Sequence, residues 1–248
     1  MDKLTSMTIS DEHLVSGKYV KEHLKLSQSL FNAYLVRDVD VLESSPTEGL
    51  RWEHDDNRYA SLTDAQVRSV LQKVANKPEW FRWFMLIAIY SGARRSEIAS
   101  LRPCDFKQCE DTGRYYFVIS EGKTKAARRM VPVHKSLEEA GLLEWIGNGQ
   151  RLIFPIVAKN PSRVTDSFNR LLDDRFNDLG ERIVFHSTRH TFITKARAAG
   201  MTNVLVQQVI GHEKTGAGMT DRYTHTFQLK DVLQVVDAVD YGELTTEQ

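Results

Sequence analysis

Apolar side chains return at helical spacing soon after position 60. Thr63 and Gln66 stand three residues apart, the spacing of a capping box that satisfies backbone N–H groups at the start of a helix. Valine and leucine then recur at intervals of three and four, which places them on one face of a helix. The pattern predicts an amphipathic helix after Thr63, with these residues facing the core: Val67, Val70, Leu71 and Val74.

A second helix is predicted to begin at Pro78, because proline suits the first turn of a helix. The run from Trp80 to Tyr90 is apolar on nearly all sides, which is typical of a buried helix. A Ser-Gly break follows, and the next helix is expected to start close to Arg94. This arrangement would let Arg94 project from a helix N-terminus, a favourable place to hold an anion.

Two β-rich runs, 115–120 and 130–133, flank a short basic segment. Such runs separated by a turn predict a two-stranded antiparallel ribbon. The turn would carry a basic tip made of Lys123, Lys125, Arg128 and Arg129.

Further helices are predicted at about 137–145 and 162–179, and an apolar stretch runs from 204 to 210. In the second of these, the inward-facing residues are expected to be Val164, Phe168, Leu171, Leu172 and Phe176. With one ribbon among many helices, the elements predict a mainly α fold with a small antiparallel β-sheet, of the α+β class.

One amphipathic helix is predicted near each end of the chain. A lone amphipathic helix is predicted at 24–36, and a tail helix is predicted at about 227–240. The tail helix carries an apolar stripe made of Leu229, Val232, Leu233, Val236 and Val239. A stripe of this kind must be buried, either on the helix's own domain or on another chain.

Charge is balanced overall but not along the chain. The 248 residues hold 33 Lys and Arg against 33 Asp and Glu. Residues 57–226 hold 26 basic and 17 acidic side chains, a net charge of +9, and both ends are acidic. A basic body between acidic ends suits a polyanionic partner such as DNA, although an ordinary charged surface can also have this composition.

The remaining composition excludes several classes of protein. The longest apolar run is far shorter than the ~20 residues needed to span a bilayer, and the first residues do not form a secretory leader. Cys104 and Cys109 are not spaced as zinc ligands or as a disulfide framework. We therefore expect a protein of a reducing cytoplasm, large enough for one good core and a small appendage.

Several residues in the second half of the chain have the chemistry to bind and break a phosphodiester. Arg94 and Arg189 can grip a phosphate, because a fixed guanidinium offers forked donors to its oxygens. His186 stands three residues before Arg189, so a helical turn would bring an acid/base group to the same face. His212 follows Gly211, and Tyr223 comes 11 positions after His212.

These segments resemble the tyrosine recombinases of the phage integrase family. Four family boxes, roughly G-x-R-x-S-E, H-x-x-R-H-T, L-G-H and R-Y-x-H, are met in order within about residues 60–240. The resemblance implies the fold of the tyrosine recombinase catalytic domain and a DNA strand-cleaving and rejoining enzyme that needs no cofactor and no metal ion. The implied catalytic residues are Arg94, Lys123, His186, Arg189, His212 and Tyr223.

The resemblance also assigns individual roles. Tyr223 would be the nucleophile that forms a 3′-phosphotyrosine, and His186 the general acid/base. His212 would be a second hydrogen-bond donor to the phosphate. Lys123 would protonate the leaving group from the ribbon, with Lys125 as its competitor. Supporting roles fall to Glu97 and His190, and the residues expected to bind DNA are Lys125, Arg128 and Arg129.

Two regions depart from the family pattern. The stretch between His212 and Tyr223 is about two residues longer than expected and contains two glycines, so the tyrosine is expected to swing in from a loop. Residues 1–56 are too short for a complete clamp and are interpreted as the remnant of a helical core-DNA-binding domain with a linker. The catalytic domain is assigned to residues 57–248.

The family resemblance further implies partners and a setting. We expect a homotetramer on a specific double-stranded DNA site, with the tail helix docking on a neighbouring subunit and with accessory DNA-bending or directionality proteins. The setting would be the cytoplasm of a bacterial host, in association with the nucleoid.

Other functions compete with recombination. A type IB topoisomerase or a telomere resolvase uses much the same residues, and a non-catalytic DNA-binding remnant of an integrase would retain part of the pattern. The phage-type His212 and Tyr223 boxes favour the recombinase. A metal-dependent nuclease is disfavoured, because the acidic pairs at 138–139 and 173–174 have no histidine at ligand spacing.

Overall fold

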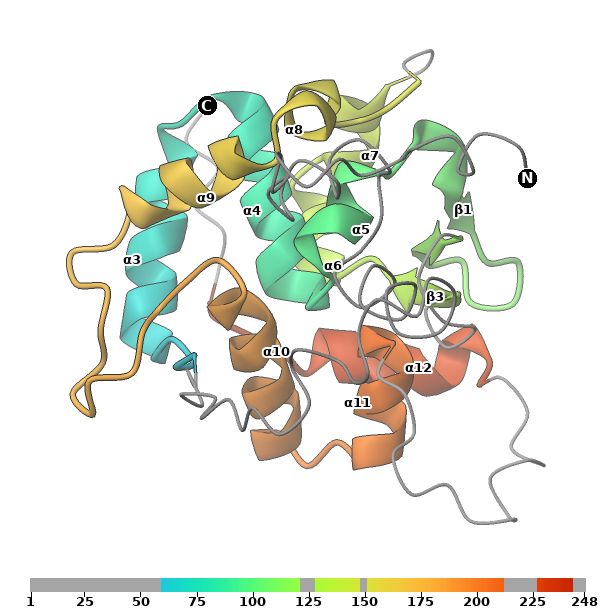
Figure 1. Ribbon diagram of the computed structural model, residues 1–248. Coiled ribbons are helices and arrows are strands. Elements are labelled where there is room, and N and C mark those ends of the chain that lie inside the picture. The colour runs from blue at the N-terminus through green and yellow to red at the C-terminus, as the bar shows by residue number, and fades with distance from the viewer. Residues whose placement is uncertain (1–58, 121–127, 148–150, 212–226, 243–248) are drawn as a thin grey trace, which may run out of the picture. The chain divides into compact units, whose positions relative to one another are not determined.

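The computed structural model describes residues 59–120, 128–147, 151–211 and 227–242 (Figure 1). All of them belong to the second of two units, Asp56–Gln248. The N-terminal segment 1–56 and its predicted helix at 24–36 lie outside the described residues. Within the described ranges, no helix is both long enough and apolar enough to cross a bilayer.

The first two described helices pack against each other and build much of the core (Figure 1). Helix α3 (Asp64–Ala75) starts with the predicted capping box, in which Thr63 and Gln66 bond each other's backbone N–H groups. Helix α4 (Glu79–Ser91) follows Pro78, and its residues from Phe84 to Ser91 are all buried. Both helices were predicted from the sequence, and both are confirmed.

A three-stranded antiparallel sheet in the order β1-β2-β3 lies beside the helices. Strands β2 (Tyr115–Ile119) and β3 (Arg129–Pro132) form the predicted ribbon, with Phe117 opposite Val131. Strand β1 (Phe106–Gln108) was not predicted. It is three residues long, too short for an alternating pattern to stand out, and it pairs with β2. The mainly α fold with a small antiparallel sheet is thus confirmed.

The middle of the chain contains shorter helices than the pattern predicts. The helix expected at about 137–145 is split at Gly141, whose φ of 86° breaks the helical path. The helix expected to reach residue 179 ends at Asn169, and Phe176, predicted to face inward, is 52% exposed. The later part of the expected helix forms turns instead, since Asp174 and Asn177 bond the backbone of the residues that follow them. The elements of this region are α5 (Arg95–Ala99), η1 (Pro103–Asp105), α6 (Lys135–Glu139), α7 (Leu142–Ile146), α8 (Pro155–Lys159) and α9 (Ser162–Asn169).

Three further helices complete the described unit. Helix α10 (Ser187–Ala198) packs on α4, and α11 (Asn203–Ile210) packs on α10 and β3. Helix α12 (Leu229–Asp237) lies against α11 and β3 (Figure 1).

The apolar stripe of α12 is buried within its own chain. Val232, Val236 and Val239 are at most 1% exposed, Leu229 is 4% exposed, and Leu233 is partly buried. Arg114 adds a polar tie, because its guanidinium donates to both carboxylate oxygens of Asp237 at 2.7 and 3.1 Å. The expectation that this stripe docks on a neighbouring subunit is therefore wrong. The helix that carries these side chains already packs on α11 and β3.

Candidate active site

Arg94 lies directly before the first turn of α5, at the end of a sharp change of direction after α4. Gly92 makes this change with φ 63°, and a Cβ atom there would come within 2.7 Å of the Phe192 ring. Only glycine fits both demands. Arg94 is the N-cap residue of α5, and its side chain is 38% exposed, so the guanidinium remains accessible.

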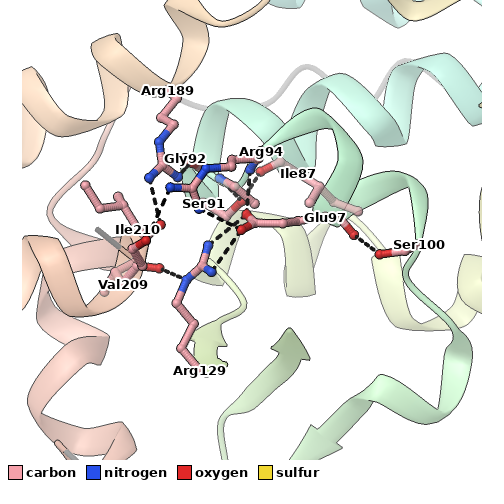
Figure 2. Close-up of polar contacts among 12 residues, drawn as sticks. Ile87, Ser91, Gly92, Arg94, Glu97, Ser100, Arg129, Arg189, Val209 and Ile210 are labelled. Carbon is pink, nitrogen blue, oxygen red and sulfur yellow. Dashed lines mark hydrogen bonds and ion pairs between the residues drawn. The ribbon is translucent and has the colours of Figure 1, made fainter. Parts of the chain in front are cut away.

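Glu97 fixes Arg94 in place. Its carboxylate accepts hydrogen bonds from the backbone N–H of Arg94 and from Nη1 of the same residue, both at 2.8 Å. Glu97 is buried, and its carboxylate also accepts hydrogen bonds from Nη1 and Nη2 of Arg129, at 3.1 and 2.9 Å (Figure 2). Burial alone would raise the pKa of the Glu97 carboxyl, but the bonds and charges of Arg129 and Arg94 hold it below its ordinary value.

Arg189 comes from the first turn of α10 and is 4% exposed. Its Nη1 donates to the carbonyl oxygen of Gly92 and its Nη2 to that of Ile210, both at 2.7 Å (Figure 2). The two carbonyls hold the guanidinium from α4 and α11, so two neighbouring helices set its orientation. Burial, and then the positive charges of Arg94 and Arg129, lower the pKa of Arg189.

The described part of this cluster carries more positive than negative charge. Arg94, Arg129 and Arg189 surround Glu97, the carboxylate that bonds two of them. Each neighbouring guanidinium makes the charge on Arg189 more costly, so an anion placed beside Arg94 and Arg189 would relieve a repulsion that the folded protein already contains. The arrangement is suited to a phosphate.

His186 precedes α10 as its N-cap residue, one turn before Arg189. Partial burial of its ring, followed by the positive charges of His190, Arg189 and Arg94, lowers the pKa of His186 to about 4. The imidazole is therefore neutral at neutral pH and can accept a proton. His190 lies edge-on to it, with ring centroids 5.0 Å apart, and burial and Arg189 lower its pKa as well.

The structure brings four of the predicted site residues together, namely Arg94, Glu97, His186 and Arg189, with His190 beside His186. Lys123, Lys125, His212 and Tyr223 lie outside the described residues. The last described residue before His212 is Gly211, whose carbonyl oxygen accepts from Nη2 of Arg94 at 3.3 Å. The His212 box therefore begins at the arginine cluster.

Arg129 requires a correction. It was expected on the exposed basic tip as a DNA-binding residue, yet its side chain is 0% exposed and bonds Glu97 and the carbonyl oxygen of Val209. Alternation along β3 could have indicated this, because Arg129 shares a strand face with the buried Val131. Arg128 directly precedes β3, is exposed, and donates to the carbonyl oxygen of Ser120 at 3.1 Å.

The acidic pairs weighed for a metal-dependent nuclease have other partners. Asp173 bonds Lys73, and Glu138 bonds Arg114. In the described ranges, no group of three or more His, Cys, Asp and Glu side chains is arranged to hold a metal ion.

The described unit is a mainly helical domain with a three-stranded sheet and a cluster of three arginines around Glu97, and the comparison with protein families identifies its class. Residues 60–229 match the model of the phage integrase family. The match covers more than half of the chain, which therefore belongs to that family. A search of curated protein sequences gave no match.

Solved structures share the fold at low sequence identity. A lambda integrase dimer bound to a COC′ core site has a TM-score of 0.53 at 17% identity, over 86% of this chain and 64% of that chain. The integrase from mycobacterium phage Brujita has a TM-score of 0.53 at 15% identity, over 94% of this chain and 81% of that chain. A lambda integrase tetramer bound to a Holliday junction has a TM-score of 0.50 at 17% identity, over 86% of this chain and 64% of that chain. The chain thus spans less than two thirds of the lambda integrase chains.

Proposed function

We propose that this chain is a site-specific DNA recombinase that cuts and rejoins DNA through a 3′-phosphotyrosine on Tyr223 and needs no metal ion. The observation that carries the proposal is the placement of Arg94 and Arg189. Both guanidiniums are held by backbone carbonyls at the end of α11, directly before His212. Their mutual repulsion favours an anion between them, and the scissile phosphate of DNA is that anion.

In the proposed reaction, the hydroxyl oxygen of Tyr223 attacks the phosphorus and the bond to the 5′ oxygen breaks. The neutral imidazole of His186 takes the tyrosine proton, and the ammonium of Lys123 gives a proton to the leaving 5′ oxygen. Arg94, Arg189 and His212 stabilise the charge that gathers on the non-bridging oxygens. The phosphoester bond stays on the enzyme, so the reverse attack by a 5′-hydroxyl rejoins the strand without a nucleotide cofactor.

Duplex DNA is the proposed partner, and a homotetramer on that DNA is the proposed assembly. The structures of lambda integrase as a dimer on a core site and as a tetramer on a Holliday junction support this choice. The N-terminal segment 1–56 is proposed to belong to the DNA-binding part of the protein, ahead of a catalytic domain at 57–248. Because the phosphate contacts are electrostatic, DNA binding should weaken steeply with salt.

A nicked suicide substrate tests the proposal. A pool of nicked duplexes with randomised sequence around the nick would be incubated with the wild type, Tyr223→Phe and Tyr116→Phe in the presence of a chelator. We expect a covalent adduct that maps to Tyr223 in the wild type and in Tyr116→Phe, and no adduct in Tyr223→Phe. An adduct on another residue, or one that appears only when a divalent metal is added, would overturn the mechanism.

A further inference from the structure

Arg129 joins three separate parts of the active site. It stands at the start of β3, its two terminal nitrogens grip both carboxylate oxygens of Glu97, and its Nε donates to the carbonyl oxygen of Val209 at 2.6 Å. A buried guanidinium is stable only when its donors are satisfied. These bonds therefore fix the distance between the sheet, the first turn of α5 and the end of α11.

The last carbonyls of α11 are each taken by a different arginine. The oxygen of Val209 accepts from Arg129 and that of Ile210 from Arg189 (Figure 2). The oxygen of Gly211 accepts from Arg94. The final carbonyls of a helix have no partner within the helix, and its C-terminal end carries partial negative charge, so cations are favoured there. The end of α11 thus acts as a shared anchor for three guanidiniums.

Glu97 links Arg129 to Arg94. The carboxylate is shared between the two arginines, and its orientation is set by the fork of Arg129, which cannot rotate because Val209 holds its Nε. Glu97 in turn holds the backbone N–H and Nη1 of Arg94. A displaced Glu97 would let the guanidinium of Arg94 turn away from the position that leaves its outer face open to an anion.

We propose that Arg129 is a positioning residue, which acts through Glu97 on Arg94 and through Val209 on the end of α11. Its side chain is 0% exposed, so the proposed role is exerted through these contacts and not by direct contact with the substrate. The functional part of this inference rests on the proposed role of Arg94 in gripping the scissile phosphate. The geometric part of the inference states that Arg129 holds the Arg94 guanidinium in place through Glu97. It can be tested without the reaction.

The geometric part is tested by nuclear magnetic resonance of the arginine Nε–Hε groups. Arg129→Lys keeps a positive charge but lacks the fork, so it cannot hold both Glu97 oxygens and Val209 together. Arg129→Met removes the charge as well. Arg95→Met is the matched control, since Arg95 is exposed, lies beside Arg94 and donates to Thr165.

In the wild type and in Arg95→Met, we expect the Arg94 guanidinium to rotate slowly about its Cζ–Nε bond and its signal to shift on addition of inorganic phosphate. In both Arg129 variants, the rotation should become fast and the phosphate-induced shift smaller. An Arg94 signal unchanged in Arg129→Lys and in Arg129→Met would overturn the proposal. If Arg129→Met fails to fold, the Arg94 signal of Arg129→Lys alone decides the test.

Adduct formation on the nicked substrate then tests the functional part. At saturating DNA, the rate in Arg129→Lys should fall by about 10²-fold, the loss typical of one misplaced oxyanion donor. The DNA concentration at half-saturation should stay close to that of the wild type, because the Arg129 side chain is buried. A merely structural role predicts a smaller active fraction with an unchanged rate. If the wild type forms no adduct while the Arg94 signals respond as expected, the proposed function fails and the positioning role of Arg129 stands.

Discussion

A Cβ atom on Gly211 would lie 2.5 Å from Nη1 of Arg129, well inside any normal approach of carbon to nitrogen. Gly211 also has φ 65° at the end of α11, a conformation that costs residues with a Cβ atom about 1–2 kcal/mol. The end of α11 and the guanidinium of Arg129 therefore fit together because position 211 has no side chain.

Replacement of Gly211 should lower the free energy of unfolding by more than the strain of a left-handed backbone conformation alone. Gly211→Ala is expected to lower the free energy of unfolding by about 2–5 kcal/mol, the sum of the backbone strain and of about 1–3 kcal/mol for overpacking. Gly200→Ala is the control, because Gly200 has φ 85° and nothing within 4 Å of its added Cβ. It should lose only about 1–2 kcal/mol. Equal losses in urea denaturation would contradict the close packing of Gly211 on Arg129.

Arg189 is expected to be among the most sensitive residues of the site. Arg189→Ala should slow adduct formation about 10²–10³-fold, because it removes a guanidinium that is proposed to stabilise the scissile phosphate. Arg95→Ala should react at close to the wild-type rate, since Arg95 bonds Thr165 on α9. Arg189→Lys should be intermediate, because one ammonium cannot donate to the carbonyls of Gly92 and Ile210 in the geometry of the fork. Single-turnover kinetics on the nicked substrate measures all three rates.

The sequence predicted those elements whose signal is local. The capping box of α3 involves Thr63 and Gln66, three residues apart, and the ribbon of β2 and β3 shows as two β-rich runs. The Arg94 and Arg189 boxes were likewise recognised as short strings. Their convergence followed from the family resemblance, since Arg189 and the carbonyl of Gly92 are 97 positions apart in the chain.

The errors concern contacts between distant segments. Arg129 looked like part of a basic tip, and its burial depends on Glu97 and Val209, which no short window contains. The stripe of α12 must be covered by something, but the sequence does not reveal that α11 and β3 cover it. The predicted helix does not extend through 174–181, because Asp174 and Asn177 offer the backbone competing hydrogen bonds there. This signal was present in the sequence and was outweighed by apolar periodicity.

His186 should titrate far below an ordinary histidine. Its pKa is lowered to about 4 by partial burial and by the charges of His190, Arg189 and Arg94, so its imidazole should stay neutral through pH 6 to 8. Arg189→Gln removes one of these charges and should move the midpoint upward, towards the ordinary value of about 6.5. Nuclear magnetic resonance of the imidazole ring checks both values. A wild-type midpoint at or above 6.5 would contradict the effect of burial and of the neighbouring charges on the pKa of His186.

His134 should make folding stability depend on pH. It is 1% exposed and packs against Tyr90 with tilted rings whose centroids are 4.5 Å apart. Its pKa is lowered to about 4, chiefly by burial. The unfolded chain binds a proton near pH 6.5 and the folded chain does not, so stability falls as the pH drops from about 6.5 to about 4. The loss from this residue should reach about 3 kcal/mol. Urea denaturation of the wild type and of His134→Asn gives the difference curve, which should be flat above pH 6.5 and slope only below it.

Burial of the α12 stripe within the chain predicts how its valines affect the monomer. Val236 is 0% exposed, so Val236→Ala should lower the free energy of unfolding by about 1–3 kcal/mol through lost burial and a new cavity. Lys230 on the exposed side of the same helix is the control, and Lys230→Ala should change stability by less than about 0.5 kcal/mol. Denaturation would be measured at protein concentrations low enough to keep the chain monomeric. If Val236→Ala left the monomer as stable as Lys230→Ala and only weakened self-association, the stripe would belong to an interface between subunits and not to the contact with α11 and β3.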